Sequence, residues 1–338
     1  MSPWMYGLAL MLVMYNCKKK EEPFPQVPNS ELVNEINAIV AAPVTLVQPA
    51  AVTTTPATLA PSAKAAEVAG AMSSLSSGTV PASVQTASTD IKAALSTNEL
   101  GALTAVSPAM VSAIAAGGAL PANLKAIVDK AAANPALQAY LPRITLPTVN
   151  GRTVSGRSGA PESIERTEGI EVEDACVLAA KAIFDAAKAR LDATKTTKDA
   201  EVAAAFSAAI APLVAEQTSC TSGLPATYNA LRAGGQSQAA QALANLDAAQ
   251  SVIPADLYAT LRALINIQLL GFLSSVNTLQ AADLKACGEK TTAKTTAATA
   301  ARDANAAAVK ASYEEALAKA TAKRGELTQS CHNQGGGR

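Results

Sequence analysis

Four cysteines in the second half of this 338-residue chain constrain its fold more than any other feature. Cys176, Cys220, Cys287 and Cys331 are separated by intervals of 44, 67 and 44 residues. An even number of cysteines is typical of disulfide-bonded proteins from oxidising compartments. Two arrangements produce the equal intervals. Either each 44-residue segment is a helical hairpin closed on itself (Cys176–Cys220 and Cys287–Cys331), or the two segments are single antiparallel helices (Cys176–Cys331 and Cys220–Cys287).

The spacing of apolar residues favours two long antiparallel helices. Neither segment has Gly or Pro at its midpoint, where a hairpin would turn. Two helices of 44 residues are each about 66 Å long, so both pairs of cysteines would come into register together. Pro212 is expected to kink the first helix. The residues that recur at intervals of three and four through the first midpoint are Val177, Ala180, Phe184, Ala187, Leu191, Thr194, Lys198, Val202, Phe206, Ala209 and Leu213.

The insert between the inner cysteines, residues 221–286, predicts a helical hairpin. We expect a break at Gly234-Gly235 and a second helix that begins at Pro254. This second helix carries the richest apolar stripe of the chain, which favours a place at the centre of the bundle over an exposed interaction face. The stripe consists of Leu257, Leu261, Leu264, Ile265, Phe272, Val276 and Leu279.

Alanine explains why helices are favoured over other folds. The chain contains 77 alanines, almost half of its 49% hydrophobic residues, and only 3% aromatic residues. Alanine is the best helix former but buries little area, which argues against a β-sandwich or an α/β enzyme core. We therefore predict an all-α fold: an elongated helical bundle with two long antiparallel helices stapled by disulfides, plus a smaller N-terminal helical region.

The rest of the chain divides by composition. Residues 17–62 contain seven prolines and predict an anchor and tether, interrupted by one short helix capped by Ser30 and stopped by Pro43. Residues 63–142 predict short helices with very few charges, a region that either packs on the rest of the protein or forms a contact surface. Residues 143–172 predict an irregular linker. The four-cysteine helical domain spans 173–332, and 333–338 predict a flexible tail.

An apolar run near the N-terminus, residues 7–15, is too short to span a membrane and is typical of a secretory signal. Cys17 follows it, and residues 13–17 read Val-Met-Tyr-Asn-Cys. This segment resembles the lipobox of bacterial lipoprotein precursors. The resemblance implies that residues 1–16 are a signal peptide and that Cys17 is the lipidated first residue of the mature protein. The alternative is an ordinary signal peptide followed by an incidental cysteine.

The charges after Cys17 bear on where the protein is displayed. Lys20, Glu21 and Glu22 resemble the surface-export signal of Bacteroidota lipoproteins, in which a lysine and two acids follow the lipidated cysteine. This resemblance implies an outer-membrane, surface-exposed lipoprotein. A periplasm-facing protein with a solvated charge run at this position is the alternative.

Catalytic signatures are scarce. The single histidine, His332, lies near the C-terminus, and the CxxC, HExxH and GxxxxGK[ST] motifs are absent from the sequence. The formal net charge of zero argues against a nucleic-acid partner. We expect no catalytic residues, no metal and no cofactor. The expected function is a non-enzymatic structural or protein-binding module at the envelope, attached to the membrane by its lipid. Alternatives are an accessory subunit of an outer-membrane transport, secretion or assembly complex and, less favoured, a hydrolase that uses carboxylates.

Overall fold

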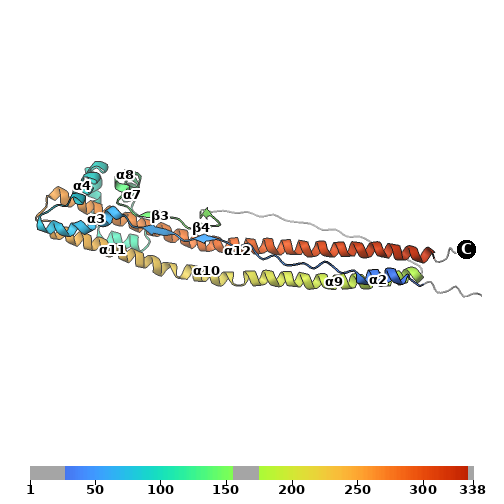
Figure 1. The fold of residues 1–338 in the computed structure, drawn as a ribbon. Coiled ribbons are helices and arrows are strands. Elements are labelled where there is room, and N and C mark those ends of the chain that lie inside the picture. Colours follow the sequence, from blue (N-terminus) through green and yellow to red (C-terminus); the bar gives the residue numbers. More distant parts are fainter. Residues whose placement is uncertain (1–26, 155–174, 334–338) are drawn as a thin grey trace, which may run out of the picture. The chain divides into compact units, whose positions relative to one another are not determined.

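The computed structural model of this chain describes residues 27–154 and 175–333 and is 76% helical, which confirms the predicted all-α class (Figure 1). The helices are α2 (Ser30–Ala38), α3 (Ala63–Met72), the 3-10 helix η1 (Ser73–Ser77), α4 (Ala82–Ala94), α5 (Thr97–Thr104), α6 (Pro108–Ala115), α7 (Ala122–Ala133), α8 (Pro135–Gln138), α9 (Ala175–Ile210), α10 (Leu213–Ser222), α11 (Leu224–Ala248) and α12 (Ala255–Asn333). The strands are β1 (Thr54–Thr55), β2 (Thr58–Ala60), β3 (Arg143–Thr145), β4 (Thr148–Val149) and β5 (Arg152–Thr153).

The chain forms two compact units. Among the described residues, unit 1 comprises 27–47, 175–205 and 302–333, and unit 2 comprises 48–154 and 206–301. Helices α9 and α12 each contribute one part to unit 1 and one part to unit 2.

Unit 1 is built on an antiparallel pair of helices, residues 175–205 of α9 and residues 302–333 of α12. The disulfide Cys176–Cys331 joins the beginning of α9 to the end of α12, so the two helices run in opposite directions. Midway along the pair, the Tyr313 hydroxyl donates a hydrogen bond to Asp192 at 2.6 Å. Most buried residues of the pair are small, so the helices of unit 1 gain little hydrophobic stabilisation per residue. The buried residues are Cys176, Val177, Ala180, Ala187, Leu191, Val202, Asn305, Val309, Ala316, Ala320, Leu327 and Cys331.

Unit 2 has a much larger apolar core. Helix α11 and the first part of α12 form the predicted hairpin, and α12 begins directly after Pro254, as expected. The apolar stripe of α12 is core rather than an exposed face, because Leu261, Leu264 and Val276 are almost fully buried. The low-charge region 63–142 packs onto this hairpin through α3 to α8, with Met72, Leu103 and the other apolar residues of these helices in one cluster with α12. Packing therefore accounts for the scarcity of charges in this region.

Serine side chains cap two of the short helices in region 63–142. Ser96 and Glu99 form a reciprocal capping box at α5, and Ser107 caps α6 ahead of Pro108. The Lys130 ammonium, which donates a hydrogen bond to Glu99, and the Ser96 backbone N–H together lower the pKa of Glu99 to about 2. The carboxylate that caps α5 therefore stays ionised well below neutral pH.

Proline and glycine behave differently inside the long helices. At Pro212, where a kink is expected, the helix is interrupted, because α9 ends at Ile210 and α10 begins at Leu213. The break predicted at Gly234-Gly235 is wrong, because α11 runs without interruption through both glycines. A Cβ on Gly235 would lie 2.4 Å from a ring carbon of Phe272, whereas a Cβ on Gly234 would meet nothing within 4 Å. Gly235 thus allows close approach of α11 to α12, which is a packing role rather than a helix stop.

These two glycines provide a matched pair of substitutions. Gly234→Ala is expected to stabilise unit 2 by about 0.5–1 kcal/mol, because alanine loses less backbone entropy in a helix. Gly235→Ala gains the same helix propensity but forces the Phe272 ring to move, an overpacking effect of about 1–3 kcal/mol. Thermal unfolding of the two variants should therefore show G235A as the less stable protein, and a G235A variant as stable as G234A would contradict the packing role.

Two segments predicted to be irregular have defined structure where they are described. Within the predicted tether 17–62, β1 pairs with β4 and β2 pairs with β3. Within the predicted linker 143–172, β4 and β5 form a hairpin whose turn is Asn150-Gly151, with φ angles of 50° and 73°. Both turn residues have positive φ, the requirement that makes Asn-Gly favourable in two-residue hairpins. The first helix is also capped differently than predicted, since Asn29 rather than Ser30 accepts from the backbone N–H groups of the first turn.

Candidate functional site

The structure pairs the cysteines as the long-helix arrangement predicts. Disulfides join Cys176 to Cys331 and Cys220 to Cys287, each with a Cα–Cα distance of 5.9 Å. The alternative of two self-closed hairpins is therefore wrong.

The predicted lipidation and export residues, Cys17, Lys20, Glu21 and Glu22, lie outside the described residues, as do the signal peptide 1–16 and residues 334–338 of the tail. Their roles stay predictions.

Helix α2 covers the end of unit 1 that carries the Cys176–Cys331 disulfide. Ile36 of α2 is fully buried in a cluster with Ala180 and Ala187 of α9 and Leu327 of α12. Beside this cluster, the Glu35 carboxylate forms an ion pair with the Lys323 ammonium at 2.8 Å. The hydrogen bond to Glu326, and next the one to Glu35, raise the pKa of Lys323 to about 12. The short N-terminal helix is thus part of the packing of unit 1.

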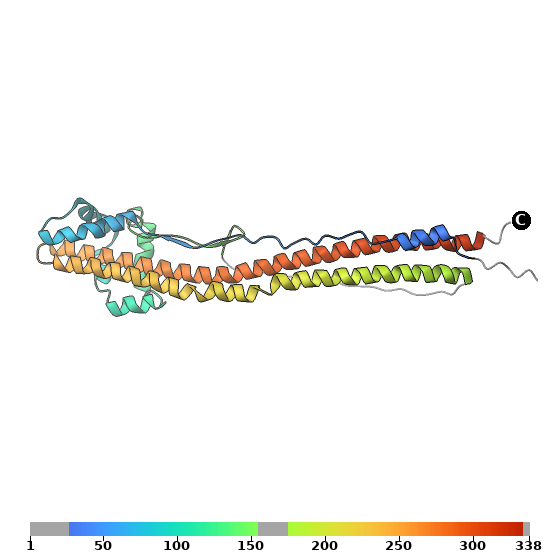
Figure 2. The same cartoon turned by 60° about the horizontal axis from the view of Figure 1, so that its bottom comes forward.

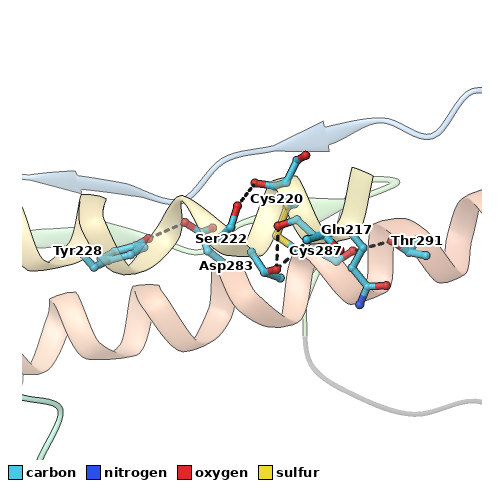
Figure 3. The surroundings of a disulfide bond; sticks show 10 residues. Gln217, Cys220, Ser222, Tyr228, Asp283, Cys287 and Thr291 are labelled. Carbon is cyan, nitrogen blue, oxygen red and sulfur yellow. Dashed lines mark hydrogen bonds between the residues drawn. A yellow bond between two sulfur atoms is a disulfide. The ribbon is translucent and has the colours of Figure 1, made fainter. Parts of the chain in front are cut away.

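The Cys220–Cys287 disulfide lies near a hydrogen bond between α11 and α12 in unit 2 (Figure 3). The Tyr228 hydroxyl of α11 donates to the Asp283 carboxylate of α12 at 2.5 Å. Burial of the ring, and next the hydrogen bond to Asp283, raise the pKa of Tyr228. The tyrosine therefore stays protonated near neutral pH and acts as a fixed hydrogen-bond donor rather than as an acid or base.

Arg232 of α11 is a charged residue buried inside unit 2. It is only 6% exposed, and within the described residues its guanidinium donates to side-chain amide oxygens alone: two bonds to Asn277 (2.9 and 2.8 Å), one to Asn229 (2.9 Å) and one to Gln280. Asn277 in turn donates from Nδ2 to the Ile114 carbonyl at 3.2 Å. The network therefore joins α11 and α12 to the end of α6. The acceptors of the buried Arg232 charge in this network are side-chain amides.

Unit 2 contains a small pocket of about 170 Å³ between α3, α11 and α12. Its walls are mainly apolar, and two of its polar groups are already engaged: the Ser62 hydroxyl donates to the Ala139 carbonyl, and Tyr140 donates to Asp90. Gln268 also lines it, and its Nε2 is the one buried side-chain nitrogen or oxygen without a hydrogen-bond partner among the described residues. This volume resembles cavities of ~150 Å³ that hold benzene, so the pocket fits a small apolar group. Its lining residues are Pro61, Ser62, Ala65, Ala66, Ala69, Tyr140, Pro142, Gly235, Gln238, Ala239, Ala242, Ile265, Gln268, Leu269 and Phe272.

The carboxyl and tyrosine groups with shifted pKa values share one trend among the described residues. Shifted carboxyl groups, such as Glu99, Asp192 and Glu216, all have pKa values lowered by hydrogen bonds from lysines. The shifted tyrosine pKa values are all raised. Every one of these shifts moves a group away from neutral pH, the opposite of what general acid–base catalysis requires. Residues 27–154 and 175–333 also contain no group of three or more His, Cys, Asp or Glu side chains that could hold a metal ion.

Helix α12 passes a membrane-span criterion based on length and composition, with a mean hydropathy of 1.4 over its most apolar window. That window is 67% buried inside the protein. Core helices of compact domains satisfy the same criterion, and the apolar stripe of α12 is accounted for by the core of unit 2.

Comparison with known proteins found no matching family model, no matching curated protein and no matching solved structure.

Proposed function

We propose that the protein is an exported, lipid-anchored helical module of the bacterial envelope, which serves a structural or protein-binding role and is not an enzyme. The observation that carries this proposal is the pair of disulfides between long helices. Such bonds persist in oxidising compartments outside the cytoplasm, and the lipobox-like segment ending at Cys17 supplies a route and an attachment. Three acyl chains on Cys17, as bacterial lipoproteins carry, would exceed the two signals that suffice for stable anchoring.

The way unit 1 is stabilised supports a structural role. Its helix pair buries mostly small side chains, and a disulfide closes its end. On its surface, intrahelical ion pairs recur at i,i+4, such as Lys181–Asp185 and Lys188–Asp192. The disulfide and the surface ion pairs compensate for the small core of this helix pair.

Lipidation and export can be tested together in the native host. Mass spectrometry of the mature protein should show an N-terminal lipidated Cys17, and Cys17→Ser should move the protein from the membrane fraction to the soluble fraction. Alkylation before lysis should find Cys176, Cys220, Cys287 and Cys331 unreactive. Free thiols at these four positions, or a membrane-bound protein whose Cys17 is unmodified, would reject the proposal.

A second candidate function is an accessory subunit of an outer-membrane transport, secretion or assembly complex. The feature that favours it is a groove of about 690 Å³ on unit 2. The groove is lined by α7, by the segment from Gln138 to Ile144, and by residues 271–278 of α12. Ile144, 38% exposed, and Arg143 lie on its wall, a mixture of apolar and charged groups that suits a protein partner. A stoichiometric membrane protein that copurifies after mild detergent extraction, and is lost in an Ile144→Asp variant, would favour the complex over the free-standing module.

A further inference from the structure

Residues 27–47 of the predicted tether are bound along the helix pair of unit 1. We call residues 27–47 the N-terminal strap. Besides the buried Ile36 and the Glu35–Lys323 ion pair, hydrogen bonds hold the strap. Arg190 donates to the Asn37 carbonyl at 3.2 Å, Ser312 donates to the Ala42 carbonyl at 2.8 Å, and Asn305 binds Val47. The Asn305 amide accepts from the Val47 N–H at 2.7 Å and donates to the Val47 carbonyl at 2.9 Å. The buried Asn305, 3% exposed, thus pairs with both backbone groups of one strap residue, as a neighbouring β-strand would.

The contacts also fix the direction of the strap. Along the strap from Glu35 to Ala42 to Val47, the partners on α12 run backwards, from Lys323 to Ser312 to Asn305. The strap is therefore antiparallel to α12, and its N-terminal end lies at the end of unit 1 that the Cys176–Cys331 disulfide closes (Figure 2).

This direction limits how far unit 1 can lie from a lipid on Cys17. Only eleven residues, 18–28, separate Cys17 from Asn29, the cap of α2. An extended chain of this length spans at most about 40 Å. If residues up to Gln48 were free instead, the same limit would be about 105 Å. The strap thus shortens the connection to the membrane by more than half.

We propose that the disulfide-closed end of unit 1 faces a lipid bilayer surface and is held near it by the docked strap. This inference rests on the proposed function, because it requires lipidated Cys17. This end of unit 1 faces a bilayer rather than a partner protein, because the chain that leads to the lipid leaves unit 1 at this end. The strap acts as a positioning element that sets which end of unit 1 is near the membrane.

Energy transfer from the protein to the bilayer tests the orientation. The lipidated full-length protein is reconstituted into phosphatidylethanolamine–phosphatidylglycerol vesicles that contain an acceptor-labelled lipid. A donor is introduced through a non-natural amino acid at Gln329, close to the closed end, or at Ala307, both of which are exposed. The two positions are about 33 Å apart along α12. Transfer from Gln329 should be at least about twofold more efficient than transfer from Ala307, given this offset along the helix.

A matched pair of strap variants tests the cause. Ile36→Asp places a carboxylate where Ile36 is buried and should release the strap, while the Cys176–Cys331 disulfide still closes the helix pair. Val40→Asp adds the same charge to the strap at a position that is 77% exposed and should leave it docked. We expect I36D to lower transfer from Gln329 by at least about half and to raise hydrogen exchange of the amides of α2 and of Val47, with V40D like the unaltered protein.

The outcomes separate this inference from the proposed function. Vesicle flotation that does not depend on Cys17 rejects the lipid anchor and, with it, both proposals. Flotation that depends on Cys17, combined with equal transfer from Gln329 and Ala307 or with a higher value at Ala307, overturns the orientation alone. Rapid exchange of the amides of α2 and of Val47 in the unaltered protein overturns the docked strap, whether or not a lipid is present.

Discussion

Removal of the Cys176–Cys331 disulfide is expected to unfold unit 1 and to leave unit 2 folded. Chain-entropy estimates assign about 4–5 kcal/mol to a crosslink across loops of 67–155 residues, the separations of the two disulfides. Unit 1 buries few large apolar side chains beyond Ile36, Leu191 and Leu327 and has little else to replace that contribution. A Cys176→Ser/Cys331→Ser variant should therefore lose about a thousandfold of its amide protection in residues 175–205 and 302–331.

The inner disulfide provides the control. Loss of Cys220–Cys287 removes a similar entropic contribution, but these cysteines belong to unit 2, whose core joins α11 and α12 to α3 through α8. A Cys220→Ser/Cys287→Ser variant should lower the midpoint of thermal unfolding of unit 2 without unfolding it at 25 °C. Hydrogen exchange followed by mass spectrometry resolves the two units by peptide. If the Cys176→Ser/Cys331→Ser variant lost protection equally in both units, the size of the buried apolar core would not explain which unit depends on its disulfide.

The disulfide pairing could be predicted because it depends on arithmetic and periodicity alone. Equal intervals of 44 residues bring both cysteine pairs of antiparallel helices into register, and apolar residues continue through the midpoint where a hairpin would have turned. The break at Pro212 follows from a missing N–H and a ring clash, which no tertiary contact restores. Backbone chemistry of this kind is local, so one sequence suffices to predict it.

The features that were predicted wrongly depend on contacts between distant residues. Gly235 is tolerated within α11 because Phe272, 37 residues later, occupies the space of its absent side chain. The strap lies on unit 1 because Asn305, some 258 residues away, pairs with Val47. Neither partner is marked by its neighbours in the sequence. The hairpin at Asn150-Gly151 is different, since an Asn-Gly pair between short β-favouring runs is a local signal for a two-residue turn.

The second large expected effect concerns the buried charge of Arg232. In an Asn277→Leu variant the guanidinium loses the acceptor of two of its four hydrogen bonds, and the Ile114 carbonyl loses its donor from Asn277. A buried cation left without its partners destabilises by about 3–5 kcal/mol. Denaturant unfolding of unit 2 should therefore show N277L as one of its most damaging single substitutions.

Removal of the charge should reverse part of this damage. An Arg232→Met variant has no cation to desolvate, so its cost should stay near 1–3 kcal/mol, the penalty for the amides left without their donor. The double variant R232M/N277L should then be more stable than N277L alone, which is a favourable coupling in a double-mutant cycle. Arg262→Met is the control, because Arg262 joins the same two helices through an exposed ion pair with Asp247 and should change stability by less than about 1 kcal/mol. Additive effects of R232M and N277L would mean that the amides do not solvate the charge, and that the network joins α6, α11 and α12 by packing alone.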